Sequence, residues 1–403
     1  MTINILDAGC GVGKTTAMIN YINNSQEEQR YLYITPFLDE VERIKKSCPT
    51  KNFKTPKPNK TKLQDIITLF QEGHNIVTTH ILFTKFNDKI LDIIREKGYM
   101  LIMDEVVNTV EGIKISQYDL QTITTKYAIV NPMTNLLEWT ADEYEGRFED
   151  YRKLIEKGSI AACTETDNNG NQVVTTIIKI LPYKIFASFK KIFIIAYMFK
   201  YQIAYYYFQM LNANFKQWYV KDFELTEEPQ KYDYTKTKEL IKICNNEKIN
   251  QIGNARGALS VSWFQKNTKS DLMLQLKRNT SNFFRHHSKT PSKNNLWTTY
   301  KQYQQDLQSK RYIKGFAPLN IRATNQYKNK TAIAYLANRY MQPYVMKFFA
   351  TKGIKCDQNK FALSEIIQFI MRGGARDGKE MMLYIPSKRM RILVEEWKKR
   401  PND

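Results

Sequence analysis

The chain has 403 residues, of which 42% are hydrophobic, so it is long enough for two or three domains and too apolar to remain disordered. Lys and Arg number 61 against 40 Asp and Glu, and the formal charge of +21 predicts a polyanionic partner, first nucleic acid and second an anionic membrane. A basic surface that only serves solubility, or a lysine excess from an AT-rich genome, would give the same charge.

Several classes of protein are excluded by what the chain lacks. The five cysteines show neither CxxC spacing nor a neighbouring His cluster, so no zinc site or disulfide framework is predicted. The most apolar run, Ile192–Phe208, contains Lys200 and Gln202 and is shorter than the roughly 20 apolar residues of a membrane span. The first predicted strand begins at Ile3, which leaves no room for a signal peptide. We therefore expect an intracellular protein with no membrane partner.

A glycine-rich segment, Ala8–Thr16 (AGCGVGKTT), follows an apolar stretch at 3–6 and opens a predicted helix at 15–22. In that context glycines let the backbone aim its N–H groups at an anion, and the helix N-terminus adds partial positive charge. Lys14 can reach the β- and γ-phosphates, and the Thr15 hydroxyl can ligate Mg²⁺. We therefore predict a site for ATP and Mg²⁺, rather than a structural turn, formed by Gly11, Val12, Gly13, Lys14, Thr15 and Thr16.

Apolar stretches then alternate with helical segments, which is typical of a parallel sheet covered on both faces. We predict strands at 31–34, 75–79 and 99–103. We predict three helices between and after them: one at 38–46, a second that follows a basic loop at 51–62, and a third at 80–97.

An acidic pair, Asp104 and Glu105, follows the last of these strands. Ligands of parallel sheets lie at the carboxyl ends of the strands, so both carboxylates should emerge beside the glycine-rich loop. Asp104 would then hold Mg²⁺, directly or through water, and Glu105 would position and deprotonate an attacking water. The alternative is an acidic pair that only caps the next helix.

The middle of the chain is predicted to close a first domain at 1–211. Residues 107–160 look mostly helical, a hairpin insertion is expected at about 160–180, and 192–195 and 200–211 read as a strand and a helix. A second domain at 212–403 begins with a linker at 212–238 and contains no second phosphate loop. In it we predict strands at 258–264, 312–316 and 381–385, helices at 330–349 and 387–399, and a polar loop at 288–295.

One more helix is predicted around an apolar stripe of Leu363, Ile366, Ile367 and Ile370. At about 100° per residue, Gln368, Arg372 and Arg376 fall together on the opposite face. The permanently charged arginine fork can neutralise charge that develops on a transferring phosphoryl group, and glutamine can hydrogen-bond the phosphate or the water. By periodicity alone, a solvated polar face explains the same pattern.

Taken together, these segments resemble a superfamily 2 helicase of the DEAD/DEAH-like type, in a compact form similar to those of phages and mobile elements. The family motif AxxGxGKT is matched at Ala8, Gly11, Gly13, Lys14 and Thr15, and its DExx motif at Asp104–Val107. Less specific likenesses are Thr35–Pro36 and Thr78–His80 for two strand-contacting motifs, Leu319–Asn325 for motif V and Gln368–Arg376 for motif VI.

The chain departs from the family pattern in three places. The pattern QxxGRxxR would put its second arginine at Ala375, one residue before Arg376, which leaves open whether Arg372 or Arg376 is the arginine finger. The segment expected to couple hydrolysis to domain motion, often Ser-Ala-Thr, falls at 196–198 and lacks both hydroxyls. No adenine-recognising Gln precedes the loop, so we expect loose base selectivity.

The resemblance implies an α/β fold with two RecA-like parallel-sheet domains, the phosphate loop in the first only, and ATP between them. It implies an ATP hydrolase and helicase in which Gln368 with Arg372 or Arg376 completes the site opposite Glu105. Single-stranded or forked DNA is the expected partner, with RNA and replication proteins also possible, in the cytoplasm, or in the host cytoplasm if a phage encodes the chain. Two alternatives stay open: a terminase-type DNA-packaging ATPase and an ATP-gated nucleic-acid clamp that does not unwind.

Overall fold

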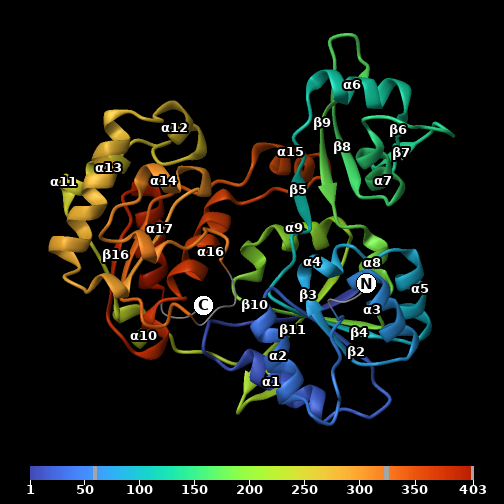
Figure 1. The fold of residues 1–403 in the computed structure, drawn as a ribbon, viewed down its shortest axis with the longest axis horizontal. Helices are drawn as coiled ribbons and strands as arrows, with labels where there is room; N and C mark the ends of the chain where they lie inside the picture. Colours follow the sequence, from blue (N-terminus) through green and yellow to red (C-terminus); the bar gives the residue numbers. More distant parts are fainter. Residues whose placement is uncertain (58–60, 322–325, 401–403) are drawn as a thin grey trace.

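A computed structural model describes residues 1–57, 61–321 and 326–400, which form two parallel sheets with helices on both faces and a smaller unit beside them (Figure 1). The first sheet has the strand order β12-β11-β1-β10-β4-β2-β3, and only β12 runs antiparallel to its neighbour. The strands are β1 Thr2–Asp7, β2 Tyr31–Thr35, β3 Ile76–Thr79, β4 Met100–Asp104, β10 Lys191–Ala196, β11 Asn214–Lys221 and β12 Glu224–Thr226.

The central strands of this sheet are apolar throughout because helices bury both of their faces. One face packs on α1 (Lys14–Asn23) and α2 (Leu38–Ser47), in a core that includes Tyr31 and Tyr33. The other face packs on α3 Lys62–Gln71, α4 His80–Phe83, α5 Asp88–Glu96, α8 Tyr183–Ala187 and α9 Ile203–Met210. The helix predicted at 80–97 is thus two helices, because the Asn87 side chain accepts a hydrogen bond from the Ile90 N–H and starts a new one.

Between β4 and β10 the chain leaves the first sheet and builds a separate unit, here called the insertion (residues 110–181). Its strands β5, β9 and β8 form an antiparallel sheet, and β6 and β7 form a second small one. The prediction of mostly helical structure at 107–160 was wrong, because only α6 and α7 are helical and the short strands lack a long periodic pattern. The bounds are β5 Val110–Gly112, α6 Gln117–Lys126, β6 Ala128–Val130, β7 Leu137–Trp139, α7 Glu149–Glu156, β8 Ile160–Thr166 and β9 Gln172–Ile180.

The second sheet is entirely parallel in the order β13-β16-β15-β14. Three predictions here were wrong. Residues 258–264 lead into α12, which Ser260 caps; 312–316 contain a single 3-10 turn; and 330–349 hold a strand and a helix that Pro343 starts. The elements are α10 Thr235–Glu239, β13 Ile241–Ile243, α11 Glu247–Asn250, α12 Val261–Lys266, α13 Asp271–Asn282, β14 Asn295–Thr298, α14 Gln304–Leu307, β15 Ala332–Tyr335, α15 Pro343–Thr351, α16 Gln358–Ile370, β16 Met381–Tyr384 and α17 Lys388–Lys399.

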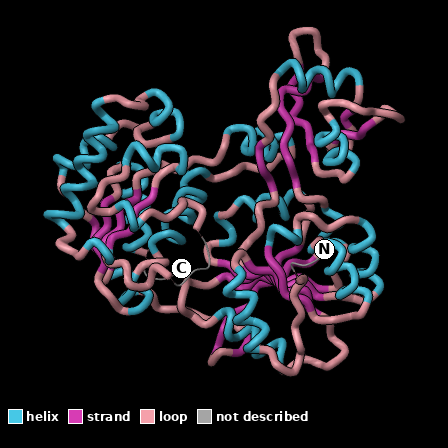
Figure 2. Tube along the Cα trace, in the orientation of Figure 1, coloured by secondary structure: helices cyan, strands magenta, loops and turns pink. Residues whose placement is uncertain are grey.

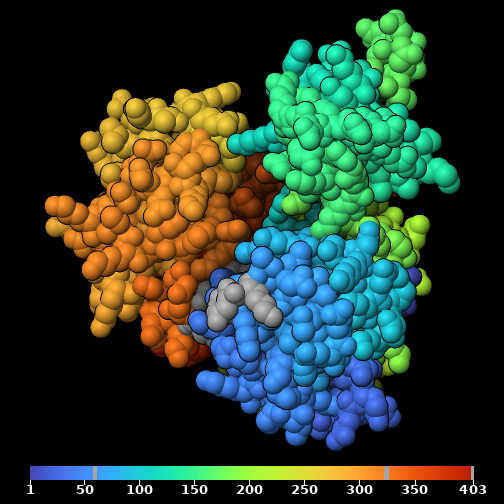
Figure 3. All heavy atoms as spheres, turned by 45° about the vertical axis from the view of Figure 1, so that its right-hand side comes forward, coloured from blue at the N-terminus to red at the C-terminus, as the bar shows by residue number. Residues whose placement is uncertain are grey.

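The two halves of the chain are interlocked rather than simply joined by a linker. The first sheet continues past residue 211 through β11 and β12 to Thr226, and the chain enters the second sheet at β13. Helix α15, although late in the sequence, packs against β5, β8 and β9 of the insertion, and Figures 2 and 3 show the insertion and the second half meeting there. Its Val345, Phe348 and Phe349 join the core of the first sheet. Among the described residues, no helix combines the length and the apolar character that crossing a bilayer requires.

Candidate functional site

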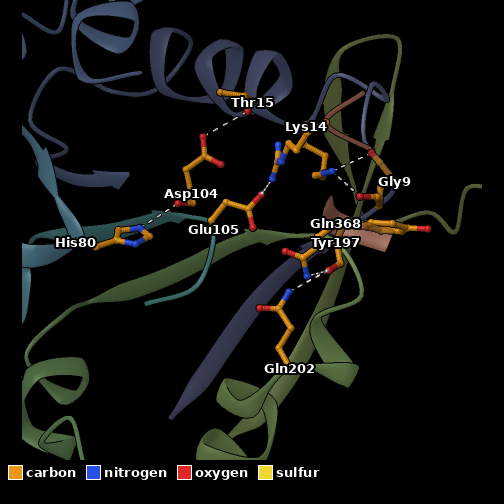
Figure 4. Close-up of polar contacts among 11 residues, drawn as sticks. Gly9, Lys14, Thr15, His80, Asp104, Glu105, Tyr197, Gln202 and Gln368 are labelled. Carbon is orange, nitrogen blue, oxygen red and sulfur yellow. Dashed lines mark hydrogen bonds and ion pairs between the residues drawn. The ribbon is translucent and has the colours of Figure 1, made fainter. Parts of the chain in front are cut away.

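The glycine-rich loop lies where β1 ends and α1 begins, at the carboxyl edge of the first sheet. Gly11 (φ 94°) and Gly13 (φ 90°) both have left-handed backbones, which side chains with a Cβ rarely adopt. The Lys14 ammonium donates to the carbonyl oxygens of Ala8 and Gly9, the latter at 2.9 Å, within the same loop (Figure 4). The loop is therefore folded around its own lysine, with Thr16 exposed beside it.

The acidic pair emerges next to this loop, because β4 lies one strand away from β1 across β10. Asp104 Oδ2 accepts hydrogen bonds from the Tyr33 hydroxyl at 2.9 Å and from the Thr15 hydroxyl at 3.4 Å. Burial, and secondarily the Glu105 charge, raise the pKa of Asp104 to about 6. A carboxylate facing a hydroxyl supplies the oxygen ligands that Mg²⁺ prefers, so Thr15 and Asp104 fit the predicted metal.

Glu105 is held in an unusual conformation. Its φ is 60°, and its N–H donates to the Ile195 carbonyl at 2.9 Å, which turns its side chain toward the second half of the molecule. Glu105 Oε1 lies 3.2 Å from Arg372 Nη2, in an ion pair whose side chains are only 14% and 5% exposed. Within the described residues, Glu105 Oε2 and Arg372 Nε are buried without a hydrogen-bond partner. These two atoms could still form hydrogen bonds, Glu105 Oε2 by accepting from a water and Arg372 Nε by donating to a phosphate.

The arginines do not lie on the helix that the sequence predicts. Helix α16 ends at Ile370, Arg372 lies in the turn that follows, and Arg376 lies in a 3-10 turn, Gly374–Asp377. The prediction of one continuous face was therefore wrong, because the chain turns at Gly373, where a Cβ would lie 2.5 Å from Met381 Sδ. The turn nevertheless brings Arg376 over the phosphate loop, with its Cγ 3.5 Å from the position of a Cβ on Gly11.

Gln368 lies elsewhere than its predicted role requires. Its Nε2 is 3.4 Å from the Tyr197 carbonyl oxygen, which also accepts a hydrogen bond from Gln202 at 2.9 Å. The amide therefore contacts the end of β10 and is 5% exposed. Tyr197 and Met198, which pack in the core of the second sheet, belong to the segment where the resemblance puts the coupling motif. This carbonyl is a polar junction between the two sheets (Figure 4).

The structure adds site residues that the sequence did not indicate. Tyr33 positions Asp104, as described above, and the His80 ring lies 3.0 Å from the Asp104 carbonyl oxygen. Tyr234, from the segment between the sheets, accepts a hydrogen bond from the Gly9 N–H at 2.7 Å. In the sequence, His80 matches only a strand-contacting motif, and no pattern connects Tyr234 to the loop. Of the motif V likeness, residues 322–325 lie outside the described residues.

The fold and the site define an α/β protein with two parallel-sheet units and a strand–loop–helix phosphate loop in the first. Residues 235–398 match the family profile described as the YonV C-terminal Rossmann-like domain. The chain is also 34% identical over 415 residues to the SPbeta prophage-derived uncharacterized protein YonV of Bacillus subtilis strain 168, covering 98% of each sequence. It therefore belongs to the YonV family.

Solved structures similar to this chain include an XPD helicase, with TM-score 0.48 and 12% identity over 98% of this chain and 95% of the other. Xpd4 of S. tokodaii gives TM-score 0.46 and 10% identity over 98% and 94%. The DUF1998 helicase MrfA, solved bound to DNA and AMPPNP, gives TM-score 0.35 and 10% identity over 100% and 49%.

Proposed function

We propose that the chain is an ATP-dependent nucleic-acid motor, a DNA helicase of phage or mobile-element replication that couples ATP hydrolysis to strand translocation or unwinding. The observation that carries this proposal is the meeting of two distant segments at one loop. Arg372 reaches Glu105 at 3.2 Å, and Arg376 covers Gly11, although both arginines come from beyond the second sheet's helix α16. Because its residues come from two units, such a site is complete only when the two units lie close together.

Each residue has a distinct role in this proposal. Lys14 and the loop N–H groups would bind the triphosphate, and Thr15 and Asp104 would hold Mg²⁺, which withdraws charge from the phosphate oxygens. Glu105 would orient and deprotonate the attacking water, and Arg372 and Arg376 would stabilise the charge that develops on the transferred group. Since the arginines belong to the second unit, hydrolysis would require the two units to close around the nucleotide. The units would separate again after hydrolysis.

The distribution of charge supports a nucleic-acid partner and suggests where it lies. Residues 247–314, which include α11 to α14, contain 13 Lys and Arg but only 3 Asp and Glu. The insertion contains 7 Lys and Arg against 11 Asp and Glu, so it contributes none of the net positive charge of +21. Contacts to a phosphate backbone should therefore concentrate on the second unit, and affinity should fall steeply with salt.

We further propose that the protein acts in the cytoplasm of the host. All five cysteines lie in the described residues and none forms a disulfide, which fits a reducing compartment. The prophage origin of its 34% identical relative supports the link to phage biology.

A strand-displacement assay on forked DNA, with and without ATP and Mg²⁺, tests the proposal. We expect unwinding that requires ATP, and a loss of roughly 10²–10³-fold in hydrolysis for Lys14→Ala, because the ammonium no longer neutralises the phosphates. Lys46→Ala, at an exposed position of α2, is the matched control. Hydrolysis without strand separation would favour a clamp, and metal-dependent cleavage a terminase. Unchanged hydrolysis in Lys14→Ala would remove the phosphate-loop assignment.

A further inference from the structure

A strained aromatic residue projects beside the phosphate loop. Asp222 and Phe223 form the two-residue turn between β11 and β12, with φ of 50° and 61°. Turns with two positive φ angles strongly prefer Asn-Gly or Asp-Gly, because a large side chain is unfavourable there. Phe223 is nevertheless 57% exposed. A strained conformation that presents a large apolar ring to solvent costs free energy twice, which points to a function for the ring.

The turn is held against the loop by specific contacts. Asn20, on α1, donates to the Phe223 carbonyl at 3.0 Å, and β12 packs along the same helix. The Phe223 Cδ1 lies 2.7 Å from the position that a Cβ would take on Gly13. A Cβ at position 13 would therefore force the ring to shift, so the aromatic ring and the phosphate loop pack closely against each other.

The other aromatic residue at the loop cannot offer an open face. Tyr234 packs over Gly9, where a Cβ would lie 2.4 Å from its ring, and it is 7% exposed. Its hydroxyl is engaged by the Gly9 N–H. Tyr234 therefore supports the start of the loop, whereas Phe223 stands at its other end, where α1 begins and the exposed Thr16 follows.

We propose that Phe223 is the stacking platform for the base of the bound nucleotide. This inference rests on the proposed function, since it assigns the base end of the same ligand. If the triphosphate binds in the loop, the nucleoside would extend past the first turn of α1. This direction places the base next to the Phe223 ring. Stacking on an aromatic face accepts any base, because every base has a π-face. The Asn20 side-chain N–H, which could donate to a base edge, already donates to the Phe223 carbonyl. The site should therefore bind ATP and GTP with little discrimination.

Calorimetric titration of the full chain with Mg²⁺ and three ligands tests this assignment. The ligands are a non-hydrolysable ATP analogue, the matching GTP analogue and inorganic tripolyphosphate, which has no base. We expect Phe223→Ala to weaken both nucleotides roughly 5- to 150-fold, the equivalent of losing one stacked base, and to leave tripolyphosphate affinity unchanged. Phe223→Trp should keep nucleotide affinity. Phe215→Ala is the control, because Phe215 lies on β11 and packs against Phe199 and Tyr205.

Each other result counts against the assignment. Unchanged nucleotide affinity in Phe223→Ala would show that the ring does not touch the base, and an equal loss for tripolyphosphate would show that it only shapes the loop. ATP affinity more than tenfold above GTP affinity would contradict recognition by stacking alone. If the wild-type chain bound neither nucleotide nor tripolyphosphate, the proposed function itself would fail, a result distinct from failure at Phe223.

Discussion

The two sides of the candidate site are built in different ways. On the first sheet, the loop and the acidic pair each follow directly from the end of a strand, so each is a short contiguous stretch of the sequence. On the second unit, Arg372 and Arg376 sit in turns after α16, and their positions depend on close packing around Gly373. We infer that the first side binds the nucleotide and activates the water, and that the second side makes hydrolysis depend on how closely the two units approach each other.

The largest effect should come from the arginines. We expect Arg376→Ala to lower hydrolysis by roughly 10³–10⁵-fold, as for a lost arginine finger, while nucleotide binding stays within a few fold. Arg372→Ala should lower hydrolysis too and should also destabilise the fold, because Glu105 is left buried without its partner. Single-turnover hydrolysis, nucleotide titration and thermal unfolding of both variants separate these effects. If neither variant changes the rate, the second side takes no part in chemistry.

A smaller effect is expected on the first side. Glu105→Gln should lower hydrolysis by roughly 10²–10⁴-fold and keep ATP binding, because the amide retains the shape but cannot accept the proton from water. Glu111→Gln, an exposed neighbour in β5, is the control. An active Glu105→Gln variant would mean that the carboxylate only pairs with Arg372 and does not activate the water.

The smallest effect concerns the stability of the binding side. Asp7, at the end of β1, accepts a hydrogen bond from the Phe199 N–H at 2.8 Å, and burial raises its pKa to about 6. Between about pH 4 and pH 6 the folded protein therefore keeps a proton that the unfolded chain loses, so stability falls as pH rises through this range and remains lower above it.

Asp7→Asn lacks this penalty. Its melting temperature relative to wild type should rise between pH 5 and pH 7, by about 1 °C for each kcal/mol relieved in a chain of 403 residues. Thermal unfolding across this pH range measures the difference, with the exposed Asp142→Asn as control. A difference that stays constant with pH would show that Asp7 is ionised throughout.

The sequence was informative where function depends on local order. A glycine-rich loop between a strand and a helix, and an acidic pair after a buried strand, are contiguous patterns, and both lie where we predicted. Contacts between distant residues leave no such pattern, so the sequence does not reveal the roles of Tyr33 and Tyr234. Strand β15 cannot be told from a helix by its pattern, because a strand buried on both faces shows no alternation. Phe223 carries no sequence signal either, because a single aromatic residue in a turn has no periodicity.

The position of α15 limits how the molecule can move. Its apolar side chains are part of the first core, and Lys347 contacts Glu165 and Thr175 of the insertion at 2.5 and 2.6 Å. The backbone therefore passes between the halves on the way to α10, again before Pro343, and once more after Thr351. Three crossings oppose wide separation and leave a small pivoting or sliding displacement. A displacement of this kind would suit a motor that moves in short steps and stays bound to the nucleic-acid strand.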